Sequence, residues 1–154
     1  MTRRAVGARP TYSVLFDLFV ADSAAGRLLS PVMAPTGLTA AQYAEYSILQ
    51  VDGPMSVTAF AAVAWVPLTT ASDTLRAMER RGHALRQRDP ADGRAWLVGL
   101  SDDGREAHAI ARRAFRKAAT RVSRLLGDAE PDVRAALRLL ADACTASADT
   151  TTNA

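Results

Sequence analysis

Most of the side chains on this chain that could do chemistry are guanidinium groups. The sequence holds 18 arginines but a single lysine, Lys117, and six of the arginines fall between residues 76 and 94. Guanidinium groups suit phosphate binding because they keep their charge at physiological pH and present several N–H donors in a fixed plane. The net charge of +3 would not by itself identify a nucleic-acid binder. The clustering of the arginines is therefore more informative than their sum.

Other reactive groups are few and far apart. Cys144 is the only cysteine, and His83 and His108 lie 25 residues apart. These residues offer no intrachain disulfide and match no zinc motif. The sequence also has no Ser-His-Asp set and no glycine-rich phosphate loop, so it predicts a protein that is not an enzyme and holds no metal or cofactor. We expect Cys144 to be a buried, inert thiol because it falls on an apolar helix face.

The chain has the length and composition expected of one soluble domain. It is 154 residues long, and 49% of them are hydrophobic. The longest apolar stretch, 59–68, is well short of the ~20 residues that cross a bilayer. The basic start has no apolar core behind it, as a secretory signal would have. We therefore expect a cytoplasmic protein without a membrane partner.

Apolar spacing and capping signals predict a mainly α fold of six helices and one hairpin. Pro31 and Pro35 are expected to terminate the first helix. Thr39 and Gln42 have capping-box spacing at the start of the second, and Ser101 caps the fifth. Ser56 and Val57 are expected to form no more than a stub of strand. The predicted helices span 12–33, 40–51, 58–65, 67–81, 102–126 and 131–145, and the hairpin strands span 85–88 and 95–100.

The fourth of these helices has two unlike faces. One face is apolar and would pack into the core; its residues are Leu68, Ala71, Leu75 and Met78. At 100° per residue, the opposite face carries Thr69, Thr70, Asp73, Ala77 and Arg80, with Arg76 and Arg81 at its margins. We expect this polar face to be exposed to solvent or to a polar partner.

A turn-rich connector at 89–94 joins the two strands, and the hairpin carries Arg86, Arg88 and Arg94. A short helix, a tight turn, a second helix with a polar face and a basic hairpin together make a winged helix-turn-helix. The second helix is about 10–12 Å across and fits a major groove about 12 Å wide, while the hairpin tip reaches the neighbouring minor groove. Arginine suits the tip because a narrow, electronegative groove favours its weakly hydrated guanidinium.

The sequence resembles the multiple-antibiotic-resistance regulator (MarR) family of bacterial transcription factors over about residues 12–145. The resemblance is carried by Gly37-Leu38-Thr39-Ala40-Ala41-Gln42-Tyr43 and by Leu75-Arg76-Ala77-Met78-Glu79-Arg80-Arg81-Gly82. It continues through the hairpin, from Arg88-Asp89-Pro90-Ala91-Asp92-Gly93-Arg94 to Leu100-Ser101-Asp102-Asp103-Gly104-Arg105. These motifs imply a winged helix-turn-helix with flanking dimerisation helices.

The resemblance also implies how the chain is organised and what it does. Residues 11–37 would be a dimerisation helix, 38–101 the DNA-binding region and 102–145 further dimerisation helices. Apart from the resemblance, residues 1–10 lack apolar periodicity and 146–154 are of low complexity, so we expect both to be flexible tails. The protein would be a homodimer that binds a pseudo-palindromic operator on double-stranded DNA, usually as a repressor, and associates with the nucleoid when bound. Many such proteins release DNA when a small aromatic or phenolic effector binds between the dimerisation and DNA-binding parts.

Several residues take on roles through this resemblance. Thr69 and Thr70 fall at the start of the recognition helix, and Arg94 is the arginine of the wing tip. Asp92 matches the wing aspartate, which by its position can pair with a nearby arginine and hold the turn in shape. Asp73 departs from the family pattern, because a carboxylate there repels phosphates unless it accepts a hydrogen bond from cytosine. The predicted DNA-binding residues are Thr69, Thr70, Asp73, Arg76, Arg80, Arg86, Arg88 and Arg94.

Some interpretations stay open from the sequence alone. Arg86 and Arg88 could pair with Asp89 or Asp92 instead of contacting DNA. An effector pocket could be lined by Tyr12, Phe16, Phe19, Tyr43 and Tyr46, although aromatic residues at helical spacing also serve as core. The basic run at 105–124 fits a solvated face or a dimer edge. An alternative function is a winged-helix module that binds other proteins, because residues 59–65 lack the charges usual in that helix and Asp73 is acidic.

Overall fold

The computed structural model describes the backbone of residues 13–152 and the side chains of residues 13–148. Within this part of the chain the six helices and the hairpin predicted from the sequence are confirmed. They are α1 (Val14–Met33), α2 (Ala40–Asp52), α3 (Val57–Ala64), α4 (Leu68–Arg80), β1 (Ala84–Arg88), β2 (Trp96–Leu100), α5 (Asp102–Leu126) and α6 (Glu130–Thr152), with short 3-10 turns η1 (Ala34–Thr36) and η2 (Gly127–Ala129). The chain divides into two compact units, which meet within α5 between Phe115 and Arg116.

The first helix ends at Met33, as predicted, although Pro31 lies inside its last turn instead of ending it. Proline removes one helical N–H donor, but the next turn still forms, and the N–H of Ala34 donates to the carbonyl of Ser30. Met33 is buried in the core of the first unit with Leu29 packed beside it, and this packing holds the last turn in place. The predicted Tyr12 start and the tail at 1–10 lie outside the described residues.

The capping box predicted for the second helix is confirmed. The N–H of Gln42 donates to Thr39 Oγ1 at 3.1 Å, and the N–H of Thr39 donates to Gln42 Oε1 at 3.0 Å. This pair satisfies two backbone donors that a helix start leaves open. At the other end, Gly53 has φ of 78° and stops α2. The start and end of α2 are therefore set by local chemistry.

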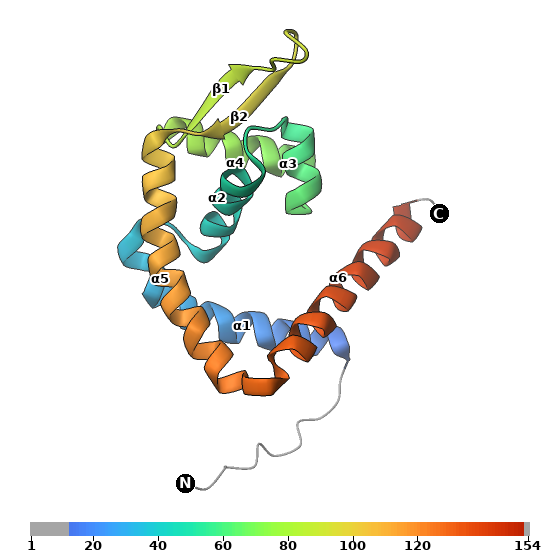
Figure 1. Ribbon diagram of the computed structural model, residues 1–154. Helices are drawn as coiled ribbons and strands as arrows, with labels where there is room; N and C mark the ends of the chain where they lie inside the picture. The colour runs from blue at the N-terminus through green and yellow to red at the C-terminus, as the bar shows by residue number, and fades with distance from the viewer. Residues whose placement is uncertain (1–12, 153–154) are drawn as a thin grey trace, which may run out of the picture. The chain divides into compact units, whose positions relative to one another are not determined.

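The core of the first unit joins the end of α1 to α2, α3, α4, the hairpin and the first half of α5. Tyr46, Phe60, Leu75 and Val98 are among its fully buried side chains. In Figure 1, α2, α3 and α4 lie together, and the hairpin stands above them in the view. The packing of α3 against α4 makes the helix-turn-helix, and burial of Leu75 and its neighbours fixes which face of α4 turns outward.

Met55 adds a third, very short strand segment to the hairpin, one residue before the stub predicted at Ser56 and Val57. β1 and β2 pair antiparallel with Ala84 opposite Leu100 and Arg88 opposite Trp96. Met55 forms a bridge to Val98, with both backbone hydrogen bonds made at 3.1 and 2.9 Å. The predicted stub at Ser56 and Val57 is wrong, because Ser56 caps α3 and Val57 begins it.

The start of α5 is fastened to the turn between α4 and β1. Ser101 Oγ accepts from the N–H of Gly104 at 3.0 Å, which confirms the predicted cap, and donates to the carbonyl of Gly82 at 2.6 Å. The N–H of Ser101 donates to the carbonyl of His83 at 3.0 Å. Gly104 allows this approach, because a Cβ there would lie only 2.0 Å from the His83 carbonyl oxygen.

The second unit holds the rest of α5, η2 and α6. Gly127, with φ of 56°, ends α5 as predicted, and α6 runs to Thr152, past the predicted end at residue 145. Cys144 is exposed, so its predicted burial is wrong for the single chain. The apolar stripe of α6 that carries Cys144 is largely uncovered, and Leu137 on this stripe is 51% exposed.

Within the described residues no helix is long and apolar enough to span a membrane, and no His, Cys, Asp and Glu cluster could hold a metal ion.

Replacing Gly104 with alanine tests the junction between α5 and the α4–β1 turn. The added methyl would overlap the His83 carbonyl, so we expect Gly104→Ala to lower the free energy of unfolding by about 1–3 kcal/mol. Gly93→Ala is the matched control, because a Cβ at Gly93 meets nothing within 4 Å. Urea denaturation measures both, and equal stability of the two variants would refute the close approach.

Candidate nucleic-acid interface

α4 turns its predicted polar face to solvent. Ala71, Leu75 and Met78 are buried on the inner side of the helix. The other side is exposed and carries Thr69, Thr70, Asp73, Arg76 and Arg80. The predicted faces are confirmed except at two positions: Leu68, predicted on the core face, is 54% exposed, and Ala77, predicted on the outer face, is half-buried. Contact of the exposed polar residues with DNA stays a prediction.

The acidic residue on this face has a basic neighbour. Arg76 Nη1 lies 3.8 Å from Asp73 Oδ1, one turn further along α4, and both side chains are exposed. An exposed pair of this kind adds little to stability, since solvent screens it. It does reduce the negative potential that Asp73 would present to DNA. The carboxylate can therefore approach a base edge with less repulsion from nearby phosphates.

Arg86 links the hairpin to α4. Its Nε donates to Glu79 Oε1 at 2.5 Å. The sequence suggested Asp89 or Asp92 as its alternative partner, but Arg86 lies opposite Val98 in the hairpin and shares the sheet face that turns toward the core. This contact holds one edge of the guanidinium and leaves other N–H groups able to bind phosphate. No local sequence signal reveals it, because it depends on how α4 and β1 meet across Gly82.

Arg88 is positioned by its cross-strand neighbour. Its guanidinium lies 4.1 Å from the centre of the Trp96 ring, and its Nη1 donates to the carbonyl of Arg94 at 3.4 Å. The register places Arg88 directly opposite Trp96, which explains the stacking. The flexible arginine is thereby held near the wing tip.

The wing turn is shaped by two aspartates acting on the backbone. Asp89 Oδ1 accepts from the N–H of Ala91 at 2.8 Å, and Asp92 Oδ1 accepts from the N–H of Arg94 at 3.0 Å. Asp92 thus contacts the backbone of the predicted arginine, not its side chain, because short carboxylates in turns bond readily to the N–H two residues on. The Arg94 side chain is exposed at the tip.

The aromatic residues suggested for an effector pocket lie in different settings. Phe16 and Phe19 are exposed on the first half of α1, whereas α1 joins the core of the first unit through its last turns. Tyr43 stacks on His108 with ring centres 5.2 Å apart, and buried Tyr46 bonds through its hydroxyl to His83 Nδ1 at 2.8 Å. Tyr12 lies outside the described residues. A pocket lined by these five residues stays a prediction.

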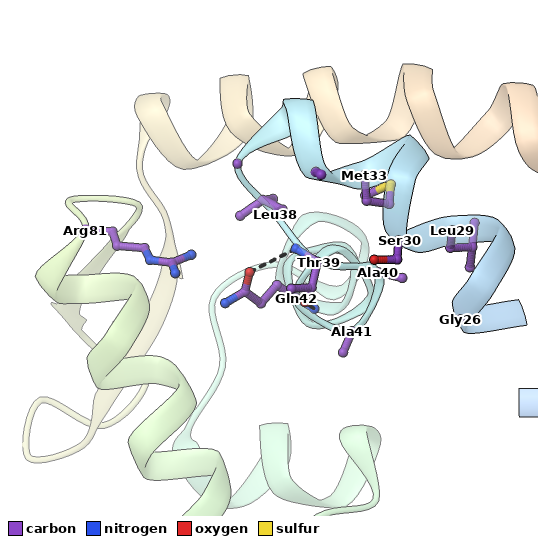
Figure 2. A pocket seen from close by; sticks show the side chains of 12 residues that line it. Gly26, Leu29, Ser30, Met33, Leu38, Thr39, Ala40, Ala41, Gln42 and Arg81 are labelled. Atoms are coloured by element: carbon purple, nitrogen blue, oxygen red, sulfur yellow. Dashed lines mark hydrogen bonds between the residues drawn. The ribbon is translucent and has the colours of Figure 1, made fainter. Parts of the chain in front are cut away.

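A cavity of about 560 Å³ lies elsewhere, between the end of α1 and the start of α2. Its lining is Gly26, Leu29, Ser30, Met33, Ala34, Gly37, Leu38, Thr39, Ala40, Ala41, Gln42 and Arg81. Figure 2 shows the Arg81 side chain reaching from the end of α4 toward Leu38 and Gln42. The sequence placed Arg81 only at the margin of the DNA-facing side of α4.

A smaller cavity of about 180 Å³ shares Gln42 and Arg81 with the first. It also contacts Glu45, Tyr46 and Thr74, so it lies between α2 and α4. Burial raises the pKa of the Glu45 carboxyl, and the hydrogen bond from Thr74 Oγ1 at 3.4 Å partly opposes the rise. Arg81 therefore stands between two cavities at the end of the helix that carries the exposed polar face.

Comparison with known proteins gives matches only among solved structures. No protein-family model and no curated protein matches the sequence. The transcriptional repressor CouR bound to a 23-mer DNA duplex is 27% identical, with a TM-score of 0.73 over 86% of this chain and 92% of that chain. The Mycobacterium tuberculosis regulator MosR in complex with DNA is 25% identical, with a TM-score of 0.76 over 88% of this chain and 98% of that chain.

Both of these proteins are MarR-family regulators. The chain has the MarR-family fold. The Streptomyces coelicolor regulator PcaV, solved with its natural ligand, shares the same fold at 21% identity, with a TM-score of 0.76 over 90% of this chain and 99% of that chain. The resemblance found in the sequence is thus confirmed in structure, and it supports a DNA-binding transcriptional regulator. Proteins of this kind are not enzymes.

Removing the wing-tip arginine tests the outer end of the interface. We expect Arg94→Ala to weaken binding to specific and random duplexes alike by about 1–3 kcal/mol per dimer, because the negative potential that attracts the guanidinium is present on every duplex. The dependence of log K on log salt should also become shallower, since fewer counterions are released. Fluorescence anisotropy at several salt concentrations measures both, with Arg27→Ala on α1 as control. An unchanged salt slope in Arg94→Ala would contradict an electrostatic contact between this arginine and DNA.

Asp73→Ala separates base reading from simple repulsion. If Asp73 accepts a hydrogen bond from cytosine, the variant should relax the preference at one position per half-site by about 1–3 kcal/mol and leave affinity for random DNA nearly unchanged. We expect this result, because Arg76 already balances the charge. Selection of sites from a random duplex pool, run in parallel with the wild type, measures it. Identical preferred sequences for the two proteins would rule out base reading.

Proposed function

We propose that the protein is a homodimeric, sequence-specific regulator that represses transcription by occupying a pseudo-palindromic operator. The observation that carries this proposal is the exposed polar face of α4 beside a hairpin whose arginines are held in place. Glu79 joins the two elements through Arg86, and Trp96 holds Arg88. These contacts hold α4 and the β1–β2 hairpin together as one surface. In this proposal α4 enters the major groove and the basic hairpin enters the adjacent minor groove.

Dimer formation is supported by apolar side chains that the single chain leaves uncovered. α1 exposes Val14, Leu15, Phe16, Leu18 and Phe19, and the second unit exposes Leu125, Val133, Leu137 and Leu139. Exposed apolar surface of this extent is characteristic of an interface. A second copy would cover these helices and place two recognition helices for the two half-sites of an operator. The same contact would cover Cys144 on α6.

We further propose that a small aromatic or phenolic effector binds in the cavity beside Arg81 and releases the DNA. The lining is largely apolar, and Arg81 supplies a cation for a carboxylate or phenolate. Arg81 also terminates α4, so a ligand that holds it would act on the end of the recognition helix. The PcaV structure, which holds a natural ligand in the same fold, supports this part of the proposal.

Binding and mass measurements test the function directly. We expect anisotropy titrations to show tight binding to a duplex selected from the genome of origin, weaker binding to random duplex, and a strong salt dependence of both. Sedimentation at low micromolar concentration should show a dimer. A folded monomer, or affinities that do not distinguish the two duplexes, would contradict the proposal.

Arg81→Ala tests the effector site. Benzoate and 4-hydroxybenzoate are titrated into the complex of protein and duplex, and we expect release of the wild type at about tenfold lower ligand concentration than release of Arg81→Ala. A charge-assisted hydrogen bond is worth about 1.5–3 kcal/mol, which corresponds to tenfold or more in affinity. Arg138→Ala on α6 is the control and should behave as the wild type. Equal release of all three proteins would place the effector elsewhere.

A further inference from the structure

Trp65 has a backbone conformation that its side chain does not favour. It ends α3 with φ of 57° and ψ of 42°, and among the described residues it is the one non-glycine with positive φ. The bend closes α3, because the N–H of Val66 then donates to the carbonyl of Ala61 at 3.2 Å. Glycine commonly ends a helix in this way, since it has no Cβ to clash. A bulky residue at such a position is strained, and strain of this kind gathers at functional sites.

The fold gains little from the Trp65 side chain. Its surface is 73% exposed, so the indole contributes little burial to offset the strained backbone. Glycine would close α3 equally well and without strain. The other tryptophan, Trp96, is explained by its stacking with Arg88. The Trp65 indole has no comparable contact to account for it within the described part of the chain, so we look for its partner outside the chain.

The position of Trp65 points to that partner. It lies in the turn between α3 and α4, directly before Val66 and Pro67, and α4 begins at Leu68. The exposed Thr69 and Thr70 follow in the first turn of α4, the end that enters the major groove in a helix-turn-helix. A residue just before that end lies at the edge of the groove, where the sugar-phosphate backbone runs. From Gly53 to Ser72 the sequence has no carboxylate to repel phosphates.

We propose that Trp65 contacts the DNA backbone beside the major groove. Its ring packs against a deoxyribose, and its Nε1–H donates to a phosphate oxygen, since indole offers one donor and no acceptor. The inference rests on the proposed function and adds a contact that carries no charge. A neutral contact of this type raises affinity for every sequence without releasing counterions. It therefore differs in kind from the arginine contacts of the wing.

Substitutions at Trp65 test this contact. We expect Trp65→Gly to bind both a selected and a random duplex about tenfold more weakly than the wild type, with an unchanged slope of log K against log salt. Its melting temperature should equal or exceed that of the wild type, because glycine relieves the strained backbone. Trp65→Phe should lie between the two, since it keeps a ring but lacks the N–H. Arg94→Ala, measured in the same assay, should lower the salt slope.

A fluorescence experiment gives an independent result. Trp65 and Trp96 are the only tryptophans, so Trp96→Phe leaves Trp65 as the sole indole reporter. Acrylamide should quench this reporter strongly in the free protein and several-fold less in the complex with DNA. Unchanged quenching would overturn the proposal.

The remaining outcomes separate this proposal from its alternatives. Wild-type affinity of Trp65→Gly, or a weaker affinity that follows a loss of melting temperature, would overturn the DNA contact. If Trp65→Gly is monomeric and still binds DNA with wild-type affinity, the DNA contact is also overturned. The indole would then contact a second copy of the chain. Failure of the wild type to bind any duplex would overturn the proposed function, and with it this contact.

Discussion

The structure depends on the junction where the end of α4, the start of β1 and the start of α5 meet. Ser101 bonds there to the carbonyl groups of Gly82 and His83, and Gly104 lets α5 approach without a side chain between them. Tyr46 joins α2 to the same junction through His83. These contacts fix the angle between the recognition helix and the hairpin. In the proposed function both elements reach neighbouring grooves of one duplex, so an error in that angle would separate the two halves of the interface.

Contacts within the chain hold or neutralise the charged side chains of the proposed interface. Glu79 engages one edge of Arg86, Trp96 holds Arg88, and Arg76 balances Asp73. The contacts of Arg86 and Arg88 limit the rotamers of these long side chains in the free protein. Less conformational entropy is then lost on binding, which favours affinity without any added charge. The modest net charge of +3 is thus compatible with a phosphate-binding surface.

Features set by neighbours in the sequence could be predicted, and features set by packing could not. The capping box at Thr39, the cap at Ser101 and the bounds of α5 follow from local hydrogen bonding and apolar spacing. The Arg86–Glu79 pair and the cavity beside Arg81 arise where distant segments meet, and no spacing rule places them. Cys144 shows the same limit. The apolar stripe of α6 that carries Cys144 is uncovered in the single chain, so helical spacing alone does not show that the thiol is exposed.

Amide hydrogen exchange with and without a bound duplex tests the central claim, that α4 and the β1–β2 hairpin form one DNA-binding surface. The account predicts slower exchange on binding at the exposed start of α4 and along the hairpin from Ala84 to Leu100, with little change in α6. Slowing confined to α1 and α6, or slowing in α4 without any in the hairpin, would contradict the claim.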